Sequence, residues 1–533
     1  EGEKLIARDG DTIEGAFLRR KKEWREKLVK IEQDFDDPER EMAAEDLQDS
    51  STLRDAEILV GLGKMKSSIR EYESALAHFM EGLRIRRFHY GNDDPRVAAV
   101  HEAIGNMHRA MGRFNEAGTS YDRALRSRRN SASECEDNQM ATISLLKSWT
   151  SLKEKTGDID EAIDTLSCCL NLQMTKLEQQ QCGNASAARD CITFSQVADT
   201  LQRRGSLCME NDRVDAALAD FTEVLRIRIQ EEGPDAPSAG DAMHTLGLLR
   251  FLKREFEAAL GHMWEALRVR KVLADEEEKC GNGSWEARML KADTLVIIGM
   301  ILHELGKPEV GIQFLDECLE LRTESMGMLD EKVADVHAAL ERAHRDLDHF
   351  EDASKHCIGA LNIIEMIHGA SDMRVPKLLL SIGMLEFKCK NYAKAKTYLE
   401  KFVLYQKERD EIENTEYVSA LLMLGKAMHK TGDKDAARET LAEAQMIYAT
   451  TQPTSRSNSV GKDLLATLRE MNMCDGDEKS VSSNESSSTT QSKKMIANGD
   501  RASPEPLGGD GFLANVRGLF SESKKVGASL RLE

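Results

Sequence analysis

Residues 56–98 read AEILVGLGKMKSSIREYESALAHFMEGLRIRRFHYGNDDPRVA, and their pattern returns eight more times along the chain. The stretch holds a Leu-Gly pair ending at Gly63, a small residue at Ala75, an aromatic residue at Phe79 and a proline at Pro95. We call the small residue the anchor, and successive anchors are 42, 45, 55, 42, 52, 42, 42 and 42 residues apart. The nine anchors are Ala75, Ala117, Ala162, Ala217, Ala259, Gly311, Ala353, Ala395 and Ala437. A period of about 20 to 50 residues is typical of a solenoid of stacked repeats.

Each repeat reads as a hairpin of two helices. Seven repeats have a glycine twelve residues before the anchor, and the other two have Thr150 and Glu341 there. Eight repeats have an aromatic or large apolar residue four positions after the anchor, one helical turn away, and the ninth has Cys357. A small residue on one helix facing a large one on its partner lets the two helices interlock.

The pattern resembles the tetratricopeptide repeat, which has Leu-Gly, then Ala-x-x-x-Phe, then Pro over about 34 residues. Because Pro95 falls twenty residues after its anchor, the second helix or its exit is expected to be about two turns longer. Residues 83–86, Leu-Arg-Ile-Arg, ahead of 91–98 resemble the 42-residue repeats of the kinesin light chain family, as do 225–228 and 267–270. This resemblance implies an adaptor whose inner groove binds short peptides of other proteins. We interpret the arginines as cations that complement the helix dipole.

We therefore expect an all-α fold, a right-handed superhelical solenoid of about nine helix hairpins with a disordered C-terminal tail. Residues 1–50 form a charged segment with one short amphipathic helix, whose apolar residues are Trp24, Leu28, Ile31 and Phe35. The array is expected over 51–450 and a capping helix over 451–473. Residues 474–533 are expected to be a disordered tail that ends in a short amphipathic segment, 512–520.

Composition excludes several classes of function. The formal net charge of -20 argues against nucleic-acid binding, which rests on Lys and Arg. The longest apolar run, residues 295–302, is too short to span a membrane, and the N-terminus lacks a signal-peptide core, so we expect a cytoplasmic protein. The 11 cysteines, among them Cys169, Cys318 and Cys357, read as reduced and buried. The chain begins at Glu1, which is consistent with a fragment of a longer protein.

No catalytic constellation is found, and we expect neither enzymatic activity nor a metal or cofactor. His101 and His108 are interpreted as partly exposed helix residues. Residues 182–186 and 280–284 share a Cys-Gly-Asn theme, and we interpret both as loops after a helix stop.

A peptide groove is expected on the first helices, at positions fifteen, eleven and eight before each anchor, as the repeat family implies. Met300 and Arg342 fall on this face. The groove residues that we select from it are Lys64, Asn106, Arg109, Lys147, His244, Phe251, His303, Arg345, Phe387 and Lys426. This basic and partly apolar lining suits acidic peptides with an apolar anchor. The chain's own 512–520 segment is a further expected ligand.

Two functions fit these features. The first is a non-catalytic adaptor or scaffold for partner proteins, similar to a kinesin light chain cargo adaptor. The alternative is a regulatory arm of an enzyme or motor encoded upstream or in another chain.

Overall fold

A computed structural model describes residues 53–131, 136–181, 192–279, 285–409, 415–451 and 459–470. The chain divides into two compact units, residues 1–227 and 228–533, and the boundary falls inside one helix.

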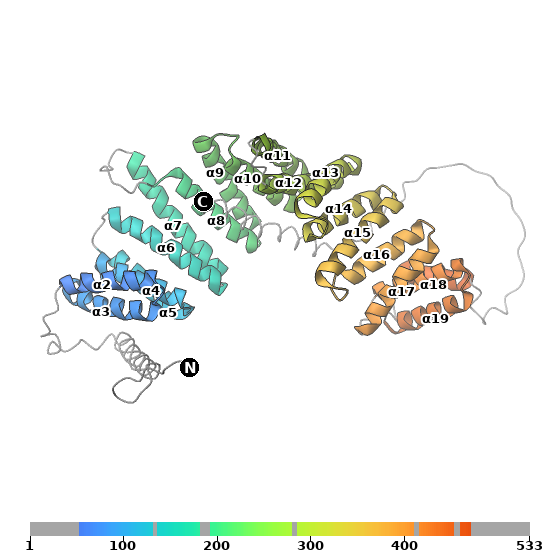
Figure 1. The fold of residues 1–533 in the computed structure, drawn as a ribbon, viewed down its shortest axis with the longest axis horizontal. Coiled ribbons are helices and arrows are strands. Elements are labelled where there is room, and N and C mark those ends of the chain that lie inside the picture. The colour runs from blue at the N-terminus through green and yellow to red at the C-terminus, as the bar shows by residue number, and fades with distance from the viewer. Residues whose placement is uncertain are drawn as a thin grey trace, which may run out of the picture. The chain divides into compact units, whose positions relative to one another are not determined.

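Helices account for the regular structure, and the described residues contain no strand. Helices α2 to α19 pair in chain order as nine hairpins, as Figure 1 shows for α2 beside α3 and α12 beside α13. This confirms the all-α hairpin fold, while the right-handed superhelix stays a prediction. The bounds are α2 Leu53–Ser68, α3 Tyr72–Tyr90, α4 Pro95–Ala110, α5 Phe114–Asn130, α6 Glu136–Thr156, α7 Ile159–Gln181, α8 Phe194–Glu210, α9 Val214–Glu232, α10 Pro237–Leu252, α11 Phe256–Lys279, α12 Trp285–Glu304, α13 Pro308–Met326, α14 Glu331–Asp346, α15 Phe350–His368, α16 Val375–Lys388, α17 Tyr392–Glu408, α18 Thr415–Thr431, α19 Lys434–Thr451 and α20 Ser459–Glu470.

The second helix is the longer one in every hairpin except α12–α13. The exit after α3 explains how the next first helix begins. Pro95 occupies the first turn of α4, where a missing N–H costs nothing, and Asp94 accepts a hydrogen bond from the Arg96 amide at 2.8 Å. Asp330 caps α14 in the same way, through the Lys332 amide.

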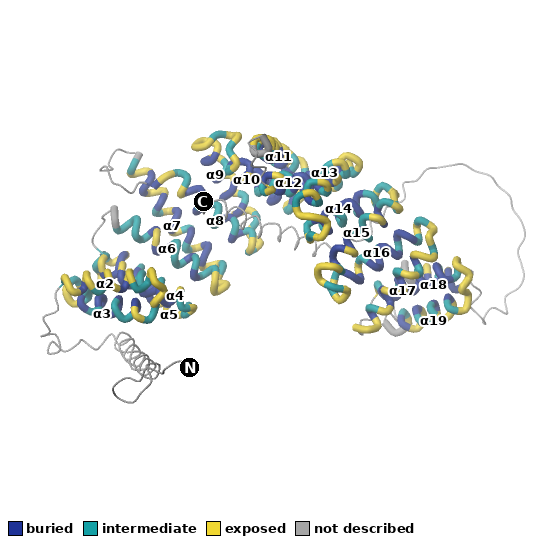
Figure 2. The backbone as a smooth tube through the Cα atoms, in the orientation of Figure 1, coloured by how far each residue is buried: buried dark blue, intermediate teal, exposed yellow. Residues whose placement is uncertain are grey.

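The two helices of a hairpin interlock where glycine faces a large side chain. A Cβ added to Gly63 would lie 2.7 Å from the Phe79 ring, and one added to Gly299 would lie 2.6 Å from Leu315 Cγ. The same close approach joins Gly105 to Tyr121, Gly205 to Phe221, Gly247 to Met263, Gly383 to Leu399 and Gly425 to Leu441. All nine anchors are buried between the helices, and Figure 2 shows the buried stretches as dark blue.

Two hairpins lack this glycine and solve the contact differently. Glu341 of α14 is buried and stands where the others have glycine, and its partner helix carries the small Cys357 at the position of the large side chain. Burial, with the Glu341 charge as a smaller cause, raises the pKa of the Cys357 thiol. In α6 the position is Thr150, which turns its hydroxyl back onto the Leu146 carbonyl at 2.9 Å. In α14–α15 the large residue, Glu341, is thus on the first helix and the small one, Cys357, is on the second, so the two helices still interlock.

The turn inside every hairpin uses a left-handed residue five positions before the anchor. Glycine supplies it at four turns, with φ of 72° at Gly306 for example. The other five turns use Arg70, Asp212, Arg254, Asp348 and Lys390, with φ between 56° and 64°. Since left-handed backbone is strained for residues with a Cβ, each of these five turns lowers the free energy of unfolding.

The last position of the Leu-Arg-Ile-Arg pattern lies eleven residues after the anchor, and at Arg270 its contacts correct our dipole interpretation. A buried arginine occupies this position after four of the anchors, at Arg128, Arg228, Arg270 and Arg322. Three of them, Arg128, Arg270 and Arg322, link neighbouring hairpins. Arg322 donates 2.7 Å hydrogen bonds to the Lys332 carbonyl of the next hairpin and to the Asp293 carboxylate of its own. Arg128 contacts Ala141 and Glu102 in the same manner, and Arg270 contacts Leu290 and Asp241. These side chains are structural links between repeats.

Helix α20 packs on α18 and α19 at the end of the array. Leu464 and Leu468 are buried there in one cluster with Leu441 and Ile447. The predicted N-terminal helix, the Cys-Gly-Asn segments and the C-terminal tail lie outside the described residues. Cys169, Cys318 and Cys357 are buried free thiols, as expected.

Candidate functional site

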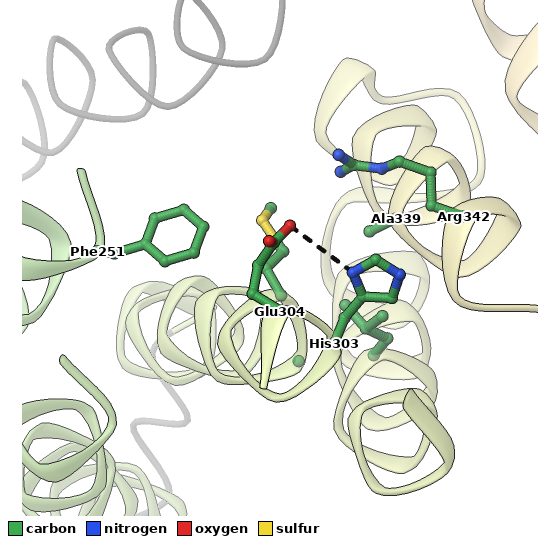
Figure 3. A pocket seen from close by; sticks show the side chains of 8 residues that line it. Phe251, His303, Glu304, Ala339 and Arg342 are labelled. Carbon is green, nitrogen blue, oxygen red and sulfur yellow. Dashed lines mark ion pairs between the residues drawn. The ribbon is translucent and has the colours of Figure 1, made fainter. Parts of the chain in front are cut away.

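A small hollow opens between the first helices of three successive hairpins, α10, α12 and α14 (Figure 3). Its empty volume is about 280 Å³, including space open to solvent. The lining residues are Phe251, Gly299, Met300, His303, Glu304, Leu315, Ala339 and Arg342.

The repeat period explains why these residues meet. Phe251 and His303 lie eight residues before their anchors, and Met300 and Arg342 lie eleven before theirs. Positions eight and eleven are one helical turn apart and so share a face of the first helix. Stacked hairpins repeat this face side by side. The hollow therefore combines an apolar wall, Phe251 and Met300, with two basic side chains.

His303 is held between two carboxylates. Its Nε2 lies 2.9 Å from Asp346 Oδ2 on α14, and its Nδ1 lies 3.8 Å from Glu304 Oε1 on its own helix. The Glu304 carboxylate, helped by Asp346 and opposed by burial, raises the pKa of His303. The same contact lowers the pKa of Glu304. A cationic imidazole is thus favoured at the edge of the hollow.

Arg342 brings a second cation to the hollow from α14, as Figure 3 shows. Burial lowers the pKa of its guanidinium, and the charges of Glu341 and Glu304 act against that shift. Partial burial strengthens electrostatic contacts with a ligand because less water screens them. Two basic side chains, His303 and Arg342, therefore lie beside the apolar wall.

The other selected residues of this compact unit lie elsewhere. His244 is buried beside Thr294 and does not line the hollow. Arg345 is a half-exposed partner of Glu341 at 3.0 Å. Phe387 packs edge-on against Tyr392 with ring centroids 5.2 Å apart. Lys426 is half-buried on α18.

The selected residues of the first compact unit do not line this hollow. Lys64 is exposed on α2, and Arg109 and Lys147 are half-exposed on α4 and α6. Asn106 accepts a 2.6 Å hydrogen bond from the Tyr121 hydroxyl, so its carbonyl is used inside the hairpin.

Two histidines correct our interpretation of them as partly exposed. His101 and His108 on α4 are both buried. Burial, with Arg123 and Arg87 as smaller causes, lowers the pKa of His101 to about 3. Burial likewise lowers the pKa of His108 to about 4. Both belong to the packing of the array.

Glu304 and Ala339 line the hollow but fall outside the selected positions. They lie seven and fourteen residues before their anchors, and widening the expected face by one residue on each side would have included them. No group of three metal-ligating side chains occurs in the described ranges. None of the helices in those ranges combines the length and the apolar composition that a membrane span requires.

These features define a class of protein, an α-helical repeat array that presents side chains of its first helices. Models of the tetratricopeptide repeat match residues 54–130, 196–271, 292–324, 376–408 and 419–445. The chain is a tetratricopeptide-repeat protein, and its 42-residue period resembles that of the kinesin light chain family. The stretches that these models leave out include α6–α7 and α14–α15, the two hairpins that lack the facing glycine.

Solved structures with similar folds come from several organisms. BtubC (BKLC) of P. vanneervenii is 18% identical, covers 53% of this chain and 98% of its own, and gives a TM-score of 0.34. A kinesin light chain protein of P. anserina with nearly identical TPR-like repeats is 15% identical, with coverages of 41% and 99% and a TM-score of 0.32. The C-terminal part of a TPR repeat-containing protein of Cytophaga hutchinsonii is 14% identical, with coverages of 60% and 98% and a TM-score of 0.40. No curated protein matches the sequence.

Proposed function

We propose that the chain is a protein-interaction scaffold. It binds acidic peptide segments on the face formed by α10, α12 and α14, and one apolar side chain of the peptide enters the hollow. The observation that carries this proposal is the hollow, which places Phe251 and Met300 beside His303 and Arg342. A buried apolar anchor supplies most of the affinity in such contacts, and charge complementarity selects the partner.

The proposal extends to a cargo-adaptor role like that of the kinesin light chain family. The 42-residue period and the Leu-Arg-Ile-Arg pattern support this. A short peptide can lie across three first helices because each helix repeats the same two positions. Specificity then comes from which hairpins offer apolar and which offer basic side chains.

Binding of a labelled peptide in which Glu and Asp residues flank one Leu tests the proposal by fluorescence anisotropy. Arg342→Glu should weaken binding about tenfold or more, since it turns attraction into repulsion in a partly desolvated site. Affinity should also fall with added salt.

Arg288→Glu is the matched control, because it makes the same change of charge at an exposed position on α12. It should leave the affinity within about twofold, apart from the small effect of net charge. Equal loss with both variants, or no loss with Arg342→Glu, would contradict the proposed site. Helix content by circular dichroism verifies that both variants fold.

A further inference from the structure

The first helix of the array exposes an apolar stripe. Ile58, Leu62 and Met65 on α2, and Ile69 just beyond its end, are 53%, 39%, 67% and 60% exposed. They are spaced 4, 3 and 4 residues apart, so they lie along one side of the helix. Large apolar side chains gathered in this way on a surface mark a contact site.

The same positions are covered in later hairpins. Counted from the anchor, Ile58, Leu62 and Met65 correspond to Val100, Ile104 and Met107 of α4, which are 1%, 4% and 8% exposed. The corresponding residues of α14 and α18 are also buried, and they are Val336, Leu340, Ala343, Ala420, Leu424 and Ala427.

In the case of α4, the second helix of the preceding hairpin, α3, buries these positions. Val100, Ile104 and Met107 share one cluster with Leu76, Met80 and Leu83 of α3, whose spacing is again 4 and 3. The stripe on α2 is therefore the surface on which the second helix of an earlier hairpin would pack. Among the described residues no earlier helix exists to cover it.

We propose that residues 24–35 of this chain dock on the α2 stripe and act as the missing second helix. The sequence upstream of α2 offers Trp24, Leu28, Ile31 and Phe35, which repeat the spacing 4, 3 and 4. Two stripes with one spacing interdigitate along their whole length. The occupant is thus a segment of the same chain with a complementary apolar face.

Two further observations support this occupant. Gly61, beside the stripe, has nothing within 4 Å of its Cβ position, which leaves room for a helix to approach closely. The connection of residues 36–52 reaches roughly 20 to 25 Å on average, about the length of α2, and holds the segment at a high local concentration. At its other end the array is already covered by its own chain, through Leu464 and Leu468 of α20.

Hydrogen exchange of the full chain, read by mass spectrometry, tests the contact. The double variant Leu28→Asp/Ile31→Asp should accelerate amide exchange in residues 53–68 about tenfold by releasing the cover. Conversely, Met65→Asp changes the α2 side of the contact and should accelerate amide exchange in residues 24–35. Because Met65 is exposed on α2, this substitution leaves the packing of the array itself intact.

The matched control is Val29→Asp/Gln33→Asp, which adds the same charge on the opposite side of the 24–35 helical pattern and should leave exchange unchanged. Unchanged exchange in 53–68 with Leu28→Asp/Ile31→Asp would overturn the proposal. So would a wild-type dimer, measured by light scattering, that Met65→Asp dissociates and Leu28→Asp/Ile31→Asp does not. In that case a second copy of the chain covers α2.

Discussion

The Arg322 guanidinium lies 2.7 Å from the Asp293 carboxylate, Nη2 to Oδ1, with the arginine side chain 1% exposed. Its other terminal nitrogen bonds the Lys332 carbonyl, so one side chain joins two helices of its hairpin and the first helix of the next.

Replacing this arginine should destabilise the array strongly. Arg322→Ala leaves a carboxylate and a carbonyl without their partner and should lower the free energy of unfolding by about 3 to 5 kcal/mol. Urea denaturation followed by circular dichroism measures it. Arg268→Ala, which removes an exposed ion pair with Asp235, should cost less than about 1 kcal/mol. Equal effects would refute the linking role.

The glycine contact inside the hairpin predicts a second effect. Gly299→Ala places a Cβ 2.6 Å from Leu315 Cγ and should cost about 1 to 3 kcal/mol through overpacking. Gly261→Ala meets nothing within 4 Å on α11 and should stabilise by up to about 1 kcal/mol through helix propensity. Thermal melts of both variants should therefore shift in opposite directions.

The left-handed turn residues predict a stabilising change. Lys390 has φ of 64°, so Lys390→Gly should raise the free energy of unfolding by about 1 kcal/mol. Gly306→Ala tests the reverse case, because its surroundings are open and only its φ of 72° is at stake. It should lower the melting temperature. A loss of stability in Lys390→Gly would refute the strain argument.

The buried His101 predicts a loss of stability in acid. Its folded pKa of about 3 lies below the ordinary value of 6.5, so the unfolded chain binds more protons between these values. Stability is present above pH 6.5 and falls as the pH is lowered, by roughly 2 kcal/mol at pH 5 from this group. His101→Gln should flatten the pH dependence of urea unfolding between pH 7 and pH 5.

His303 predicts the opposite trend for peptide binding. Its pKa is raised, mainly by Glu304, so the imidazolium persists to higher pH than in an ordinary histidine. Affinity for the acidic peptide should be highest below pH 6.5 and fall as the pH rises through the His303 pKa. The stability that His303 contributes should be lost in the same direction. His303→Gln should remove the pH dependence of binding, as anisotropy titrations at several pH values would show.

The family models and the structure differ over two hairpins for a local reason. Glu341 and Thr150 replace the glycine on which the repeat pattern depends, and α14–α15 compensates with the small Cys357. The anchors Ala162 and Ala353 identified both hairpins from the sequence even without that glycine, although the steps around Ala162 are 45 and 55 residues and not 42.

The nine hairpins could be predicted from the sequence, because each depends on contacts between residues less than twenty positions apart. Gly63 with Phe79 and Gly299 with Leu315 show how a small residue and a large one specify a helix pair locally. The roles of Arg322, His101 and His303 depend on how the helices pack and could not be read from the sequence. Arg322 bonds a carbonyl of the next hairpin, and His303 contacts Asp346, forty-three residues away, in addition to its neighbour Glu304. A one-dimensional pattern records which face a side chain occupies, whereas the stacking of neighbouring hairpins decides whether that face meets water, a carboxylate or a carbonyl.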